Sequence, residues 1–312
     1  MKHVPIRIAS VLPSATELIA ELGFAENLIA VSHECDWPSG VSELPHVTSA
    51  AMPHGLSPAE IDHWITEHLA AGKSLYSVDA QQLTDMQPDL IVTQGICDVC
   101  AVTPDHIEVS LRGQQCQLPS NTQILSLGGT SFEGVCQDVE QLARALGTTA
   151  TELLSDARRR WGSIETPTKR PRVLLLEWVE PAFSAGHWVP EQLHAAGCES
   201  VIGGPGDHSR RLTKDEILAA DPDFIGVICC GFGLAENISH AGWLFDDMQL
   251  SQLSAVREGR VWCFDANSYF SRPTLRIVDG ARLLHEAFVQ LAESPSFKRL
   301  EVATPSSRES DS

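Results

Sequence analysis

The chain has 312 residues, of which 43% are hydrophobic and 20% are charged, and its formal net charge is −19 at pH 7. This length and composition are typical of a globular protein with two domains, and the negative charge disfavours nucleic acid or an anionic membrane surface as a partner. No apolar run approaches the roughly 20 residues that a membrane-spanning helix needs, so we expect no membrane insertion.

The first core strand is predicted almost at the start of the chain, at residues 6–12. Only five residues precede it, and they leave no room for the basic start, apolar stretch and cleavage site of a signal peptide. We therefore expect a cytoplasmic protein, which would be periplasmic only if the start codon is misassigned.

Strands and helices are predicted to alternate through the first half, as in an α/β fold. Ser14 and Glu17 have the spacing of a capping box at the start of the first helix, which should end at Gly23. The first-half strands are expected at 6–12, 28–32, 90–92 and 124–127, with helices at 15–22, from 57 onward and at 83–87.

A helical pattern from 131 to 165, with a break at Gly147, separates this half from the second, and a polar, proline-flanked linker follows it. The second-half strands are expected at 172–178, from 224 onward and at 260–264, with helices at 191–196, 214–220 and 274–293. The chain is therefore predicted to comprise an N-terminal lobe (1–147), a bridging helix and linker (148–170), a C-terminal lobe (171–293) and a disordered tail (294–312).

A similar pattern of residues occurs once in each half. Residues 88–100 and 222–233 both read as Pro-Asp, a short apolar strand, and then cysteines and glycines. Ligands bind at the carboxyl ends of the strands in open α/β sheets. We therefore predict two similar halves, each with a cysteine-bearing loop at its ligand-binding edge.

The cysteines of these loops are candidate metal ligands. Cys97 and Cys100 have Cys-x-x-Cys spacing, and with His33, Cys35 and Cys229 they form the predicted ligand set for a soft transition metal. A thioredoxin-like redox pair is the alternative. The sequence contains neither a nucleophile elbow nor a phosphate-binding loop, so no catalytic residue is predicted.

Aromatic residues follow predicted strands in both halves and could form walls for a large flat ligand. Packing within the core is the alternative for each of them. The candidate ligand-binding residues are Trp37, Phe183, His187, Trp188, Tyr269, Phe270 and Arg272.

Five segments together resemble the periplasmic vitamin B12- and iron-siderophore-binding proteins, the type III periplasmic-binding-protein family. These segments are residues 7–18, 35–38, 88–92, 181–186 and 268–276. Residues 33–36, 97–102 and 186–191 match the subgroup identified as cobalamin-binding proteins. About 20 extra residues, roughly 52–76, interrupt the similarity.

The resemblance implies two lobes, each a mostly parallel sheet flanked by helices, joined by a long bridging helix, the helical-backbone metal-receptor architecture. It also implies that a corrinoid binds in the cleft between the lobes, with Trp37, Phe183 and Tyr269 at aligned cleft positions. We expect a non-enzymatic binding protein whose His33 or His187 could bind the cobalt.

The resemblance further implies the permease of an ABC transporter as a partner, but Gln81 stands where the first docking acid is expected, which weakens this interaction. Two alternatives stay open. One is a cytosolic metal- or thiol-dependent enzyme, or a metal sensor, with the same fold. The other is the binding component of an ABC-type importer of B12 or iron chelates.

Overall fold

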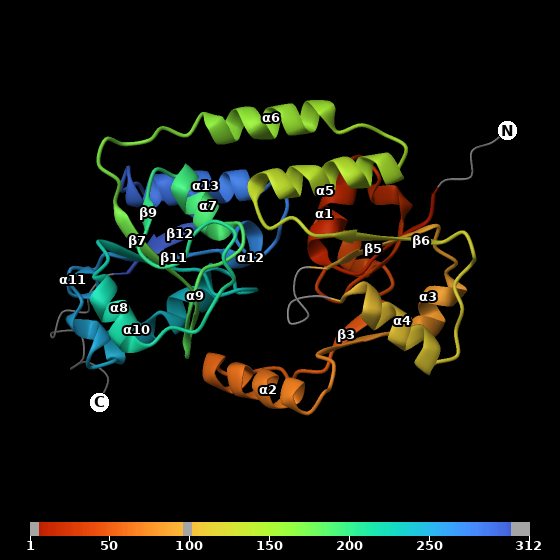
Figure 1. Cartoon of the computed structure of the whole chain (residues 1–312), viewed down its shortest axis with the longest axis horizontal. Helices are drawn as coiled ribbons and strands as arrows, with labels where there is room; N and C mark the ends of the chain where they lie inside the picture. The colour runs from red at the N-terminus through yellow and green to blue at the C-terminus, as the bar shows by residue number, and fades with distance from the viewer. Residues whose placement is uncertain (1–5, 96–101, 301–312) are drawn as a thin grey trace. The chain divides into compact units, whose positions relative to one another are not determined.

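The structure is a computed structural model that describes residues 6–95 and 102–300. It divides into two compact units. Unit 1 comprises Met1–Asp156 and Pro273–Leu275, and unit 2 comprises Ala157–Arg272 and Arg276–Ser312. Each unit has a sheet with a parallel centre and helices packed around it (Figure 1), which confirms the predicted α/β class.

The sheet of unit 1 is entirely parallel, in the order β2-β1-β5-β6. Helices α1 and α5 lie on one face of this sheet, and α3 and α4 lie on the other (Figure 1). Its strands are β1 (Ile8–Ser10), β2 (Leu28–Val31), β5 (Leu90–Gln94) and β6 (Gln123–Leu127). Its helices are α1 (Pro13–Glu21), α3 (Ala80–Asp85), α4 (Pro104–Gly113) and α5 (Phe132–Ala145), with 3-10 turns at Ala25–Asn27 and Val41–Glu43.

A two-stranded antiparallel sheet, β3 (Thr48–Ala50) with β4 (Tyr76–Val78), extends from unit 1 and contains α2 (Pro58–Ala70) between its strands. The Ser57 hydroxyl accepts from the Glu60 N–H, and the Glu60 carboxylate accepts from the Ser57 N–H, which caps α2. The segment that leads into β3 runs beside β2, because the Val47 N–H donates to the Val31 carbonyl over 3.0 Å. The residues just before the extra ones therefore run along the carboxyl end of β2.

Helix α6 (Thr151–Gly162) follows α5 after the break predicted at Gly147. The division between the two units falls inside α6, within the stretch predicted to connect the lobes.

The sheet of unit 2 has the order β12-β11-β10-β7-β8, and β9 pairs with β7. Helices α7 and α13 lie on one face and α8, α9 and α10 on the other (Figure 1). The strands are β7 (Arg172–Val179), β8 (Ala182–Ser184), β9 (Glu199–Ser200), β10 (Phe224–Val227), β11 (Val261–Phe264) and β12 (Phe297–Arg299). The helices are α7 (Val189–Ala195), α8 (Lys214–Ala220), α9 (Leu234–His240), α10 (Gly242–Asp246), α11 (Ser254–Arg257), α12 (Ala266–Tyr269) and α13 (Ile277–Phe288), with a 3-10 turn at Leu250–Gln252.

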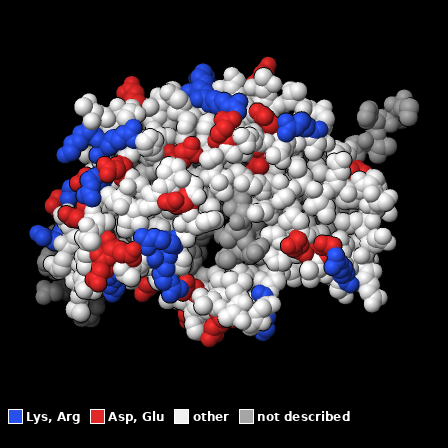
Figure 2. Space-filling model, in the orientation of Figure 1, with Lys and Arg blue, Asp and Glu red and all other residues white. Residues whose placement is uncertain are grey.

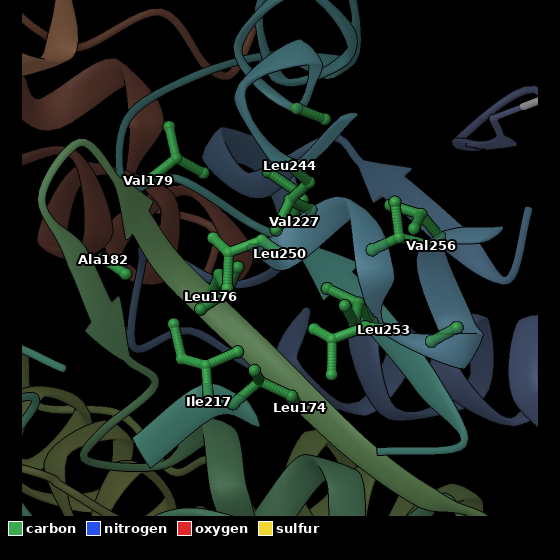
Figure 3. Packing of buried hydrophobic residues seen from close by; sticks show 14 of the residues in the cluster. Leu174, Leu176, Val179, Ala182, Ile217, Val227, Leu244, Leu250, Leu253 and Val256 are labelled. Carbon is green, nitrogen blue, oxygen red and sulfur yellow. The ribbon is translucent and has the colours of Figure 1, made fainter. Parts of the chain in front are cut away.

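The central strands of unit 2 are buried on both faces. Alternate residues of β7 and β10 fill one apolar cluster (Figure 3), among them Leu174, Leu176, Ile225 and Val227. Gly226 points to the other face, where a Cβ would lie 2.5 Å from Leu175 Cδ2 and 3.1 Å from Phe288 Cζ. The absence of a side chain at this position lets α13 pack closely on the sheet.

Two local predictions are wrong. Ser14 does not cap α1, because the helix already begins at Pro13, whose fixed φ suits the first helical position. Residues 297–299 are not part of a disordered tail. They form β12, because Phe297 packs on Phe264 with ring centroids 5.4 Å apart. The last residues, 301–312, lie outside the described part of the chain.

None of the helices in the described ranges is both long enough and apolar enough to cross a membrane. On the face shown in Figure 2, acidic and basic side chains are interspersed and do not form a basic patch.

Candidate functional site

A small pocket in unit 1 lies at the carboxyl ends of β1 and β2, the edge at which this class of sheet binds ligands. His33 lines it two residues after β2, and Thr48 of β3 and Tyr76 of β4 close one side. The pocket has a volume of about 10 Å³, which is room for about one water molecule. The remaining lining residues are Val11, Leu12, Pro13, Ser32, Glu34 and Val102.

One nitrogen of the His33 ring is within hydrogen-bond distance of a partner, and the other has no partner among the described residues. Nδ1 lies 2.7 Å from the Thr48 hydroxyl, which also accepts a hydrogen bond from the His33 backbone N–H over 3.1 Å. Nε2 is buried and has no hydrogen-bond partner within the described residues, the nearest carboxylate oxygen of Glu34 being 4.0 Å away. An oriented imidazole with one free nitrogen is the arrangement found in metal-binding histidines.

The electrostatic environment keeps His33 neutral. Burial, and then the nearby His46, lower the pKa of His33 below its ordinary value of 6.5. The ring is therefore uncharged at pH 7, which leaves a lone pair on one nitrogen for a metal or a hydrogen-bond donor.

Around His33 the charged side chains are acidic. Glu34 and Asp36 follow it in sequence and are exposed. The described residues that line the pocket include no lysine or arginine. This edge of unit 1 therefore suits a neutral or cationic ligand better than an anionic one.

Within unit 1, Cys35 does not line the His33 pocket. Cys35 is only 2% exposed, and its Sγ lies 3.1 Å from Thr16 Oγ1 in the interior of unit 1. Within residues 6–95 and 102–300, no group of three or more His, Cys, Asp or Glu side chains could hold a metal ion. Cys97 and Cys100 lie outside the described residues, so their part in a site stays a prediction.

Cys229 is also an unsuitable metal ligand where it lies. It is fully buried in the apolar cluster of unit 2, and burial raises its pKa far above the usual thiol range. Metals bind the thiolate, which this environment disfavours. Cys229 follows β10 by two residues and lies in the core of unit 2, so its part in a metal site stays a prediction.

In unit 2, a tight loop presents His187. Gly186 donates its N–H to Glu177 Oε2 over 3.0 Å, and the Ser209 hydroxyl donates to Glu177 Oε1 over 3.0 Å. The His187 N–H donates to the Asp207 carbonyl over 2.7 Å. The Glu177 carboxylate therefore joins two chain segments and fixes His187 at their junction.

His187 lies beside His208, with ring centroids 5.4 Å apart and the rings edge to face. Burial, and then repulsion from His208, lower the pKa of His187 below 6.5. A histidine whose pKa is lower in the folded than in the unfolded chain stabilises the fold above pH 6.5, and this stabilisation is lost as the pH falls through the folded-state pKa.

We therefore expect unit 2 to lose stability between pH 7.5 and pH 5.5, and the loss to be smaller in His187→Asn. Asparagine does not titrate and tolerates the positive φ of 56° at this position. Urea unfolding at both pH values measures the effect. An equal loss in the variant and the wild type would show that His187 is not its source.

Two predicted ligand-binding aromatics are buried inside unit 2. Trp188 donates its indole N–H to the Phe270 carbonyl over 3.0 Å, and both side chains are less than 10% exposed. Gln192 donates to the carbonyls of Tyr269 and Ile277 over 3.0 and 2.9 Å. These bonds fix the segment that carries Tyr269, whose own side chain is half-buried.

The other predicted residues have mixed environments. Trp37 is 38% exposed, and Phe183 is half-buried with the Arg211 guanidinium 5.7 Å from its ring centroid. Arg272 is buried and donates to Asn267 Oδ1 over 3.0 Å. Trp37 and Phe183 thus offer surface to a ligand, while Arg272 stabilises its own loop.

Sequence reasoning missed Thr48 and Tyr76, the two side chains that close the His33 pocket. Thr48 lies just before the extra residues and Tyr76 at their end, and their contacts with His33 cross a distance in sequence that no local pattern reports. In the sequence, the one indication of this part of the chain was that residues 52–76 interrupt the family resemblance.

Comparisons with known proteins agree with this geometry. The family model described as periplasmic binding protein matches residues 8–267. No protein with a curated description matches the chain. Several solved structures do, at identities that show the fold alone.

The periplasmic vitamin B12 binding protein of Vibrio cholerae is 19% identical over 91% of this chain and 96% of its own, with a TM-score of 0.60. A periplasmic heme binding protein from Pseudomonas aeruginosa is 17% identical over 96% and 100%, with a TM-score of 0.68. An ABC transporter substrate-binding protein from Listeria monocytogenes is 15% identical over 92% and 100%, with a TM-score of 0.68. The architecture of type III periplasmic binding proteins, expected from the sequence, is confirmed.

Proposed function

The chain belongs to the periplasmic binding protein family, and from this membership we propose that it binds cobalamin or a related corrinoid without transforming it. Structural neighbours described as binding vitamin B12 or heme support a metal chelate as the class of ligand. The choice between these chelates depends on the residues of this chain.

The His33 ring is the observation that carries the proposal. Its Nε2 is buried, makes no hydrogen bond to a described residue, and belongs to a ring kept neutral by burial. A neutral imidazole is a good ligand for cobalt and iron, and an unpaired buried nitrogen in a ligand-binding edge needs a partner. We propose that Nε2 binds the central metal of the chelate after the residues around the pocket move apart, because the pocket as described has room for about one water molecule.

The charges around His33 favour a corrinoid over haem. Haem carries two carboxylate side chains, which need cationic partners, whereas the corrin ring of cobalamin carries neutral amides. Glu34 and Asp36 beside His33 would repel the carboxylates of haem, and the residues described around the pocket offer no lysine or arginine to pair with them.

The family association with ABC importers makes a permease the proposed protein partner. Gln81 on α3 is neutral, and its amide donates to Asp85 Oδ1 over 2.9 Å. We propose that docking through this position is weak, because a neutral amide lacks the charge that would pair with a basic partner.

Titration of the full chain with hydroxocobalamin and, separately, with ferric haem tests the ligand. We expect hydroxocobalamin to bind at micromolar protein, with a shift of its visible absorption as imidazole replaces the axial water. Haem should bind at least about tenfold more weakly, which corresponds to about 1.4 kcal/mol. An unchanged hydroxocobalamin spectrum at micromolar protein would refute coordination, and tighter binding of haem would refute the choice of a corrinoid.

A further inference from the structure

We propose that strand β6 is a self-association surface, at which a second copy of this chain pairs antiparallel with the first and joins their four-stranded sheets into one. β6 (Gln123–Leu127) is the last strand in the order β2-β1-β5-β6, so one of its sides has no neighbouring strand among the described residues. The surface belongs to unit 1 alone and needs no bound ligand, so it goes beyond the proposed function.

The other edges of the two main sheets are protected in the described structure. At β2, the Val31 N–H donates to the Pro45 carbonyl over 2.9 Å, so a following segment covers that edge. At β8, Phe183 forms a bridge with Arg211, β9 has only two residues, and β12 carries a lysine and an arginine. Covered, very short and lysine-bearing edges are the usual protection against pairing with another chain. β6 has none of these features.

The backbone of β6 offers two residues to an incoming strand. On the side of β5, Gln123 donates its N–H over 2.9 Å, and the Leu127 carbonyl accepts a hydrogen bond over 3.0 Å. Successive residues of a strand point their N–H and C=O groups to alternate sides. Those of Ile124 and Ser126 therefore point to the open side, where neither residue forms a backbone hydrogen bond with a described residue.

Antiparallel pairing of β6 with itself uses all of these outward groups. When Leu125 lies on the two-fold axis, Ile124 of one copy lies opposite Ser126 of the other, and symmetry repeats this pair. Each such pair exchanges two hydrogen bonds, so the two pairs satisfy both outward N–H and both outward C=O groups of each copy. The two Leu125 side chains then lie opposite each other at the close spacing of a pair without hydrogen bonds.

The charge distribution also favours a second copy as the partner. Two copies with a net charge of −19 repel each other, so they meet most easily where charged side chains are absent. Residues 113–132, which contain β6, include no Asp, Glu, Lys or Arg, although charged residues make up 20% of the chain. Ile124 is 44% exposed, so pairing also removes apolar surface from water.

Sedimentation velocity of the ligand-free full chain tests the proposal. Pairing of two strands buries less area than a permanent dimer does, so we expect a dissociation constant of about 10–100 µM. Added salt should tighten the dimer, because it screens the repulsion between two acidic copies. A wild type that stays monomeric at about 300 µM would overturn the proposal, as would a dimer that salt weakens.

Ile124→Lys should weaken the dimer at least about tenfold, because symmetry places the new charge twice at an edge that pairing would desolvate. Val109→Lys is the matched control. Val109 is 66% exposed on α4, which packs against α3 and β4, and its replacement changes the net charge of the chain equally. This control should dimerise like the wild type. Equal weakening in both variants would assign the effect to net charge and overturn the proposal.

Amide hydrogen exchange locates the interface within β6. The N–H groups of Ile124 and Ser126 should exchange slowly at concentrations that give dimers and rapidly in dilute protein, because they are bonded only in the dimer. The Leu125 N–H faces β5, so its exchange should be slow in both states and is the internal control. Rapid exchange at Ile124 and Ser126 in a protein that dimerises would place the interface elsewhere and overturn the proposal.

Ser126→Pro tests the backbone bonds without adding a charge. Proline removes the outward N–H and leaves the bonds to β5 in place, which is the position that an edge strand tolerates. Each dimer then loses two of its hydrogen bonds, and we expect weaker association. Urea unfolding checks that the variants are folded. A folded Ser126→Pro chain that dimerises like the wild type would show that these backbone groups do not hold the dimer.

Discussion

Replacement of His33 by alanine is expected to weaken hydroxocobalamin binding by more than about 100-fold, beyond the loss that removal of a partner behind a ligating histidine causes. The substitution removes Nε2, the single buried nitrogen that faces the pocket without a described hydrogen-bond partner. The shift of the visible spectrum should disappear, because water then keeps the axial position on cobalt. Equilibrium titration followed by absorption measures both effects.

The matched control is His63→Ala. His63 lies on α2, is 72% exposed, and contacts Glu67 at 3.3 Å on the surface of the same unit. Its loss should leave affinity and spectrum unchanged, because an exposed ion pair contributes little. A His33→Ala protein that still shifts the spectrum like the wild type would assign coordination to another residue.

The main strands were predictable because their signals are local. Residues 90–92 and 224–227 are short apolar runs that follow Pro-Asp, and each forms a buried parallel strand. Strands β3 and β12 were not predicted, because their stability depends on distant partners. Phe297, for example, is buried against β11, more than thirty positions earlier in the chain.

For the candidate site, sequence reasoning found the position of His33 but not its surroundings. A residue that follows a core strand is placed by the strand, so the location of His33 could be predicted. The orientation of a side chain is a matter of packing. Cys35 is two positions further on and lies in the interior beside Thr16, and Cys229, two residues after β10, lies in the core of unit 2.

The tautomer and the accessibility of a nitrogen could not be predicted from sequence. They depend on Thr48, fifteen residues after His33, and on a two-stranded sheet whose pairing spans the extra segment. No short motif encodes this contact. The described residues that line the pocket include no cationic side chain, and this favours a corrinoid over haem. Which residues line the pocket likewise follows from the fold.

Replacement of Gly186 by alanine is expected to destabilise unit 2 by about 3 kcal/mol, the upper end of the usual cost of an overfilled site. A Cβ at this position would overlap the Ser209 backbone nitrogen and lie 2.9 Å from the carbonyl carbon of His208. These are main-chain atoms that the Glu177 carboxylate and the Asp207 carbonyl hold in place, so they cannot move aside as a side chain could.

We also expect a local effect near His187, because the clash pushes apart the two chain segments that the Glu177 carboxylate joins. The His187 N–H should lose its bond to the Asp207 carbonyl, and its hydrogen exchange should accelerate together with that of the Gly206 N–H, which donates to the His187 carbonyl over 3.0 Å. Urea unfolding measures the loss of stability, and exchange measured residue by residue locates it.

Gly242→Ala is the matched control for the same chemical change. At Gly242, in α10, an added Cβ meets no atom within 4 Å, and alanine is a better helix former than glycine. This control should be neutral or stabilising. If Gly186→Ala left the stability of unit 2 unchanged, the close approach of residues 186 and 209 would not be required to position His187. If its loss of stability left the exchange of the His187 N–H unchanged, the damage would lie elsewhere in unit 2.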